Sequence, residues 1–196
     1  MTAAPPTHLT LSPTQRKRLD AATAIRTDRP ERIDFLHTVQ CQCGIPYGNP
    51  GDDVREWERK QGHATLRIEA GAAYDPASGH FVPLGLPYGA KPRLVLIHLA
   101  TEAIRSGNRV VDVEDSMTAF ARALGIAVSG PHLRHLKDQL SRLASATVRM
   151  GMVEDGRAVQ VNTQIVGAFD LWFPETADQR TLWPSTVRLS TDYFNT

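Results

Sequence analysis

The chain has 196 residues, of which 41% are hydrophobic and 22% charged, and its formal net charge at pH 7 is +1. This is the composition of a soluble globular protein long enough to bury one sizeable core. The near-neutral balance excludes a strongly basic coat, so any affinity for nucleic acid must come from local placement of charge. No apolar run approaches the ~20 residues of a membrane span, and the N-terminus lacks the apolar region of a signal peptide.

The N-terminal part is predicted to be a flexible or helical extension over residues 1–29. Met1–Leu11 is rich in Pro, Ala and Thr, which disfavours a packed structure. Ser12 followed by Pro13 is typical of a helix start, and the helix is expected over Thr14–Arg26. After Pro30 a second helix is expected to end near Gly44.

The two cysteines, Cys41 and Cys43, are separated by one residue, which is too close for an ordinary disulfide. We therefore expect a reducing, cytoplasmic setting. With His37 upstream the pair suggests a metal site, but the Cys-x2-Cys spacing and a second pair are missing, so we expect no metal.

No convergent set of catalytic residues is found. The segment Gly85–Lys91 lacks the Gly-Lys-Ser/Thr ending of a phosphate-binding loop, and the chain has no Gly-x-Ser-x-Gly elbow. His132 and His135 lie three apart on a predicted helix without a convincing carboxylate partner. We expect a protein that is not an enzyme and that needs no cofactor.

The next segment alternates polar and apolar residues over His63–Glu69, which predicts a half-buried strand with Ala64, Leu66 and Ile68 on one side. A turn at Asp75–Gly79 leads to an apolar run at Phe81–Leu84, which we expect to be its partner strand.

The region from Leu86 to Met152 has the most informative pattern. Its order is helix, short strand, helix, turn, helix and β-hairpin, expected over Arg93–Arg105, Arg109–Val113, Ser116–Leu124, Pro131–Leu143, and Thr147–Val153 with Arg157–Val166. The intervening Glu154-Asp155-Gly156 is a strong hairpin turn signal. We therefore predict an α+β fold over residues 30–196: a winged helix-turn-helix with an extra β-hairpin, following the N-terminal helical extension.

The helix Pro131–Leu143 is the main functional candidate. Its apolar stripe is expected to face the core, and its polar face is expected to enter the major groove of DNA. Arg134 is suited to guanine and Gln139 to adenine, whereas Lys137 and Arg142 suit phosphates. The predicted DNA-binding residues are Arg134, His135, Lys137, Asp138, Gln139, Ser141 and Arg142 on the helix, with Arg149 and Arg157 on the wing.

Local charge agrees with this prediction. The span Leu86–Arg149 holds nine Lys or Arg and five acidic residues, a local excess of +4. The alternative is that these polar residues are a solvated helix face, or part of a protein–protein module of the same geometry.

The blocks around this region resemble the RepA-type plasmid replication initiators. The resemblance rests on LPYGAKPRLVLIHLATEAIRSGNRVVDVEDSMTAFARALGI, on the upstream block CQCGIPYGNPGDDVREWERKQGHATLRIEAG, and on the downstream blocks PHLRHLKDQLSRLASATVRM and STVRLSTDYFN. It covers about residues 30–196, and it rests on long ordered blocks rather than on a short motif.

This resemblance implies winged-helix domains that bind repeated double-stranded DNA sites at a plasmid origin, a homodimer, and possible contacts with host replication proteins. The family often has two such domains, so a second is expected beyond Thr196. Two alternatives remain open: a dimerisation or host-factor docking module without DNA contact of its own, and a small transcriptional autorepressor.

Overall fold

The structure is a computed structural model that describes residues 34–75, 77–154, 157–168 and 186–195, with residues 12, 13, 16, 17, 19, 20, 23 and 27. It divides into two units, Met1–Ile33 and Asp34–Thr196. In the first unit the described residues from Pro13 to Thr27 are helical, as expected, and the amide of Arg16 donates to the carbonyl of Ser12 at 2.9 Å. The predicted turn residues Asp155 and Gly156 lie outside the described residues.

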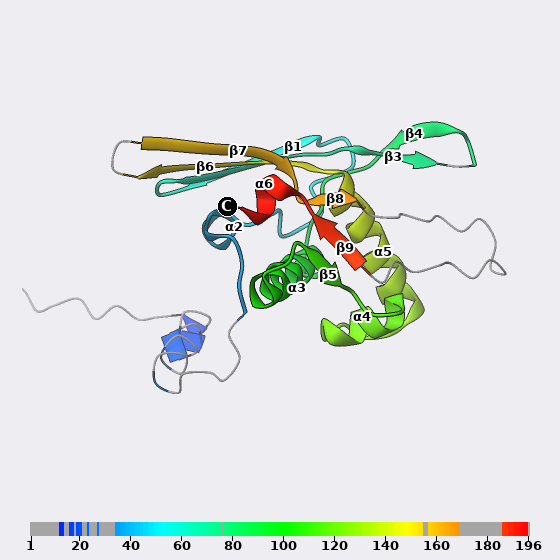
Figure 1. The fold of residues 1–196 in the computed structure, drawn as a ribbon, viewed down its shortest axis with the longest axis horizontal. Helices are drawn as coiled ribbons and strands as arrows, with labels where there is room; N and C mark the ends of the chain where they lie inside the picture. The colour runs from blue at the N-terminus through cyan, green and yellow to red at the C-terminus, as the bar shows by residue number, and fades with distance from the viewer. Residues whose placement is uncertain are drawn as a thin grey trace, which may run out of the picture. The chain divides into compact units, whose positions relative to one another are not determined.

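The second unit is a mixed α/β structure with antiparallel sheets (Figure 1). Its largest sheet has the order β1-β2-β6-β7, with β1 at Glu56–Gln61, β2 at Ala64–Glu69, β6 at Thr147–Glu154 and β7 at Arg157–Gln164. Helices lie against one face of this sheet (Figure 1). On β2 the other face carries Thr65, Arg67 and Glu69, which are half-buried.

Strand β2 confirms the predicted alternation, because Ala64, Leu66 and Ile68 are all buried. Its predicted partner was wrong. The run after the Asp75–Gly79 turn forms β4 (His80–Pro83), which pairs with β3 (Ala72–Asp75) in a separate two-stranded sheet. β2 pairs instead with β1 and β6. Local periodicity could not show this, because β1 is highly polar and β6 is about 80 residues away in the chain.

The central helices follow the predicted order: α3 at Ala90–Ser106, β5 at Val110–Asp112, α4 at Met117–Ala123 and α5 at Gly130–Ser145, followed by the hairpin β6–β7. Local chemistry explains these bounds. Gly107, in the left-handed conformation with φ 64°, ends α3. The Ser116 hydroxyl accepts from the amide of Ala119 and caps α4, and Pro131 lies in the first turn of α5.

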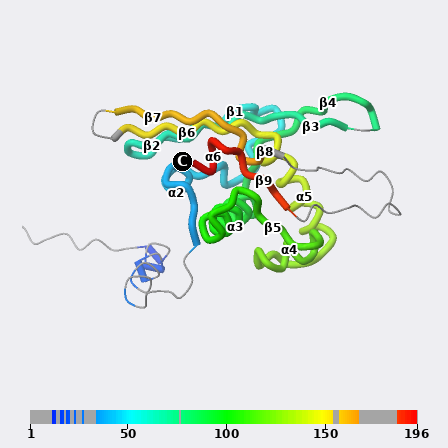
Figure 2. Tube along the Cα trace, viewed as in Figure 1, coloured from blue at the N-terminus to red at the C-terminus, as the bar shows by residue number. Residues whose placement is uncertain are grey.

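A third sheet completes the unit in the order β5-β9-β8, with β8 at Val166–Ala168 and β9 at Thr186–Leu189. Strand β5 therefore pairs with β9 and not with the β6–β7 hairpin. The chain passes from β7 into β8 with one residue between them (Figure 2). The short helix α6 (Thr191–Phe194) ends the described chain, and α2 (Thr38–Cys43) begins later than predicted but ends at Gly44.

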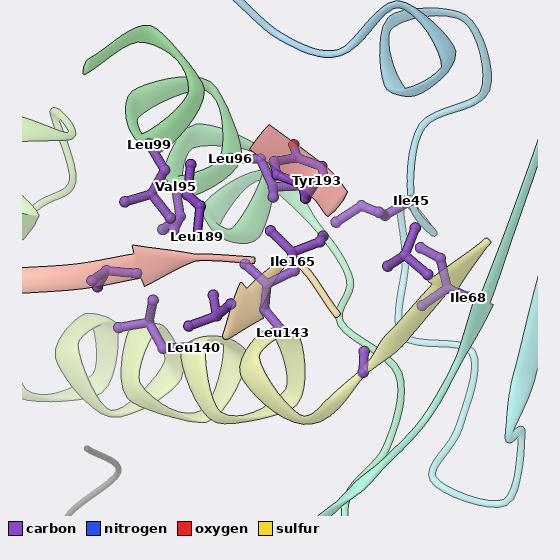
Figure 3. Close-up of a cluster of buried hydrophobic side chains, with 14 of the residues drawn as sticks. Ile45, Ile68, Val95, Leu96, Leu99, Leu140, Leu143, Ile165, Leu189 and Tyr193 are labelled. Carbon is purple, nitrogen blue, oxygen red and sulfur yellow. The ribbon is translucent and has the colours of Figure 1, made fainter. Parts of the chain in front are cut away.

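One hydrophobic cluster joins these elements (Figure 3). Side chains from α3, α5 and β9 meet in it, among them Val95, Leu99, Leu140, Leu143 and Leu189. Each fully buried aliphatic side chain of this size contributes roughly 1.5–3 kcal/mol relative to an exposed one. The cluster fixes the orientation of α5, which carries most of the predicted site. Among the residues described here, no helix is long and apolar enough to span a membrane.

Candidate nucleic-acid interface

Helix α5 buries the predicted apolar stripe, because Leu136, Leu140 and Leu143 all lie in the core. The opposite side of its C-terminal half is covered too. Residues 85–88, between β4 and α3, pack along this side, and Asp52 approaches it from the loop before β1. The polar face predicted from the sequence is therefore divided into a covered half and an open half.

Gln139 and Ser141 belong to the covered region. The Gln139 side chain is 0% exposed, its Oε1 accepts from the amide of Tyr88 at 2.7 Å, and its Nε2 donates to Asp138 at 3.0 Å. Ser141 is 3% exposed and its hydroxyl donates to the carbonyl of Lys137. Contrary to the expectation, both are excluded from a DNA-contacting surface, because their polar groups are satisfied inside the protein.

Arg142 also contacts other residues of the protein. Its Nη1 lies 2.9 Å from Asp52 Oδ1, and its Nε lies 3.0 Å from Asp138 Oδ1. The guanidinium lies over the ring of Tyr88 at 5.6 Å, and the side chain is 12% exposed. Burial acts to lower the Arg142 pKa, but the hydrogen bonds with Asp138 and Asp52 raise it above its ordinary value. Arg142 therefore positions α5 and, contrary to the prediction, is not presented to a phosphate. Asp138, also predicted to bind DNA, is engaged by Arg142.

Gly85 shows how tightly the covering segment packs. A Cβ at this position would lie 2.1 Å from Arg142 Nη1 and 2.6 Å from Asp52 Oδ1. A side chain at position 85 would have to displace the ion pair between Arg142 and Asp52.

The N-terminal half of α5 stays open. Arg134 and His132 are exposed, and His135 and Lys137 are half-buried. The His135 ring packs edge-on against Tyr88 at 5.6 Å. Burial lowers the His135 pKa, and the charges of Lys91, Arg142 and His132 lower it further, against the opposing effect of Asp138. Burial is the largest cause of this shift, and among the charged groups that act on the ring Lys91, Arg142 and His132 are basic and Asp138 alone is acidic.

The two arginines predicted for the wing do not join this group. Arg149 is on the outer face of the sheet, away from the helices, and pairs with Glu69 at 3.1 Å. Its neighbour Arg67 pairs with Glu56, Glu58 and Glu69, so the charges of this face compensate one another. Arg157 is exposed at the start of β7, and Figure 1 shows that this end of the strand lies far from α5.

Sequence reasoning missed two residues near the open half of α5. Lys91, in the first turn of α3, lies close enough to His135 for its charge to affect that pKa. Tyr47 is 81% exposed in a loop that packs on the start of α3. The sequence did contain a signal for Tyr47: the tripeptide Pro-Tyr-Gly occurs at 46–48 and again at 87–89.

From the sequence we expected no metal site at Cys41 and Cys43 or at the histidines. Cys41 is exposed, whereas Cys43 is buried and its thiol lies 3.4 Å from the carbonyl oxygen of Ala64. Within the described ranges, no group of three or more His, Cys, Asp or Glu side chains has the arrangement of a metal site.

The fold is similar to that of domains 2 and 3 of RctB. The crystal structure of domains 2 and 3 of RctB, from selenomethionine derivatives, superposes with a TM-score of 0.50 at 10% sequence identity; the likeness covers 82% of this chain and 60% of that one. At this identity the likeness concerns the fold alone, and the chain spans less than two thirds of the RctB chain. A comparison with curated proteins finds no match.

The family model of plasmid-encoded RepA proteins, RepA_C, matches residues 86–196. The chain belongs to this family, as its sequence blocks predicted. The matched region starts just before α3 and contains α4, α5 and the β6–β7 hairpin.

Proposed function

We propose that residues 34–196 form a non-catalytic, cytoplasmic origin-binding module of a plasmid replication initiator. The module is a winged helix in which the N-terminal half of α5 contacts double-stranded DNA at the origin repeats. The observation that carries this proposal is the division of α5. In its N-terminal half Arg134 is exposed and His135 and Lys137 are half-buried, while its second half is fixed in the fold. Recognition helices read base edges with their N-terminal residues.

The fixed half supports this function. Gln139 and Arg142 bind α5 to residues 85–88 and to Asp52, so the open half is presented on a rigid support. A side chain that reads a base needs its helix held within a fraction of an ångström. The basic side chains that act on His135 add attraction for phosphate.

Fluorescence anisotropy with a labelled duplex of the plasmid's own origin repeats, beside a scrambled duplex, tests this proposal. The double variant Arg134→Ala with Lys137→Ala should weaken origin binding at least tenfold, since one good base contact contributes about 1–3 kcal/mol. Arg149→Ala is the matched control, because that arginine lies on the outer sheet face, and it should bind as the wild type does. Equal affinities of the double variant and the control would remove α5 as the reader.

We further propose that the module self-associates through the outer edge of β7, which pairs with no other strand among the residues that the structure describes. Strand β2 is not available for this role, because both of its edges are paired. Of the two edge strands of the large sheet, β1 (EWERKQ) has four charged residues in six, which opposes pairing with another chain. β7 (RAVQVNTQ) has one charged residue in eight, and Val159 is 62% exposed.

Sedimentation velocity tests this edge. Val159→Lys places a charge on the edge strand and should shift a dimer toward monomer by at least tenfold in dissociation constant. Val153→Lys is the matched control, because Val153 is also exposed but lies on β6, whose edges are both paired. An equal effect of both variants, or a monomeric wild type at high concentration, would contradict an interface at this edge.

One observation favours a second candidate function, a dimerisation or host-factor docking module with no DNA contact of its own. The net charge is only +1, and the outer sheet face is charge-compensated. Under this function the wild-type module would bind no duplex even at low salt, which is the result that separates it from the first.

A further inference from the structure

The two Pro-Tyr-Gly segments of this chain lie side by side. The amide of Gly89 donates to the carbonyl of Pro46 at 2.9 Å, which joins the loop after α2 to the loop before α3. The tyrosines of these two segments differ in their contacts and exposure. Tyr88 lies between His135 and Arg142 and supports α5, whereas Tyr47 is 81% exposed. The exposed tyrosine is therefore not needed to cover α5.

Tyr47 is exposed but held in place. The guanidinium of Arg93, on the second turn of α3, lies 5.3 Å from the centre of the Tyr47 ring. The same guanidinium donates through Nη2 to the carbonyl of Ile45 at 2.5 Å, so Arg93 fixes the loop on both sides of Pro46. An aromatic side chain that is presented rigidly loses little conformational entropy when it contacts a ligand.

Lys91 connects this loop to α5. It lies on the first turn of α3, two residues before Arg93 and two after Gly89, and it is half-buried. Its charge lowers the pKa of His135. Lys91 thus adds a cation beside Arg134 and Lys137 of α5, on the helix that Arg93 joins to the Tyr47 loop. Two acidic side chains beside α5, Asp52 and Asp138, are both paired with Arg142.

We propose that Lys91 and Tyr47 form a second contact with duplex DNA, on the phosphate backbone that flanks the base pairs facing α5. The Lys91 ammonium is suited to pair with a phosphate oxygen, and the Tyr47 hydroxyl is suited to donate to one. Such contacts fix the register of a reading helix and carry no sequence information of their own. This inference rests on the proposed function of α5 and names the second element of the same interface.

The test is the salt dependence of duplex binding, measured from about 50 to 200 mM monovalent salt on origin and scrambled duplexes. Lys91→Ala should weaken binding several-fold on both duplexes, leave their affinity ratio unchanged, and reduce the slope of log K against log salt by about 0.9, the value for one phosphate. Tyr47→Phe keeps the ring over Arg93 and should weaken binding to both duplexes about equally. Lys60→Ala, an exposed lysine on the edge strand β1, is the matched control and should leave slope and affinity unchanged.

The outcomes separate the two proposals. A Lys91→Ala variant with the slope and affinity of Lys60→Ala, together with a defective Arg134→Ala variant, would overturn this inference and leave α5 as the reader. A wild type that binds no duplex would overturn both. Thermal melting of each variant checks folding, and a loss of affinity with an unchanged salt slope in a folded Lys91→Ala variant would also count against the phosphate contact.

Discussion

Arg142 on α5 and Asp52 in the loop before β1 form an ion pair at 2.9 Å although 90 residues separate them in the chain. The arginine is largely buried and the aspartate is 72% exposed. Because Arg142 also binds Asp138 and lies over Tyr88, its contacts join the loop before β1 and residues 85–88 to α5. These contacts explain why Arg142 is not available to a ligand.

Loss of this pair should destabilise the fold. Arg142→Ala removes both carboxylate partners and the contact with Tyr88, so the free energy of unfolding should fall by about 2–3 kcal/mol, the scale of hydrogen bonds to charged groups. Urea denaturation gives the value. Arg105→Ala is the control, because its ion pair with Asp34 is exposed and 3.8 Å long, and its loss should cost under about 0.5 kcal/mol. Similar costs for both variants would show that the contacts of Arg142 with Asp52, Asp138 and Tyr88 contribute little to the free energy of unfolding.

Gly71 should not tolerate a methyl group. A Cβ on Gly71 would lie 1.8 Å from the carbonyl oxygen of Ser145, at the end of α5. Backbone must move to relieve this clash, so Gly71→Ala should destabilise by roughly 1–3 kcal/mol or more, the scale of overpacking. Gly48→Ala is the matched control, since nothing lies within 4 Å of its Cβ. Differential scanning calorimetry should show a lowered Tm for the first variant only.

Tyr193 should make stability depend on alkaline pH. Its hydroxyl donates to Gln40 Oε1 at 2.7 Å in a buried site, and burial raises the pKa of this phenol well above its ordinary range. The unfolded chain therefore loses this proton first, near pH 10. The stability due to the neutral phenol is fully present below pH 10 and falls as the pH rises above that value.

Tyr193→Phe should remove this part of the pH dependence and cost about 1–3 kcal/mol at neutral pH, because Gln40 Oε1 loses its donor in a buried site. Urea denaturation of both proteins at pH 8 and at pH 11 provides the comparison. A parallel loss of stability in the two proteins between these pH values would show that Tyr193 is not the group responsible.

His135 should titrate below the ordinary histidine pKa of 6.5, because burial and the charge of Lys91 both disfavour its protonated form. Since the unfolded chain takes up this proton first, stability due to neutral His135 is present above pH 6.5 and is lost as the pH falls through its folded pKa. NMR titration of the ring protons should show a low midpoint that moves upward in Lys91→Ala. An unmoved midpoint would mean that Lys91 does not act on His135.

Several features could be predicted from the sequence because short-range chemistry decides them. The apolar spacing of Leu136, Leu140 and Leu143 places one side of α5 in the core, and Ser116, Pro131 and Gly107 set helix ends through their own hydrogen bonds and backbone preferences. The half-buried strand β2 follows from its alternation. The family blocks were also visible in the sequence, and the RepA_C match over residues 86–196 agrees with them.

The remaining features of the fold and of the candidate site depend on contacts between segments that lie far apart in the chain. Polar spacing on α5 placed Gln139 and Arg142 on the same face as Arg134, but only the packing of residues 85–88 and Asp52 buries the first two. The pairing of β2 with β6, and the position of β9 between β5 and β8, likewise arise from distant strands. The sequence by itself determined strand β2, the helices α3, α4 and α5 and the hairpin that follows them, since periodicity and caps act within a few residues. Only the tertiary structure decided which polar side chains remain available to a ligand, because burial depends on what the distant chain brings to each surface.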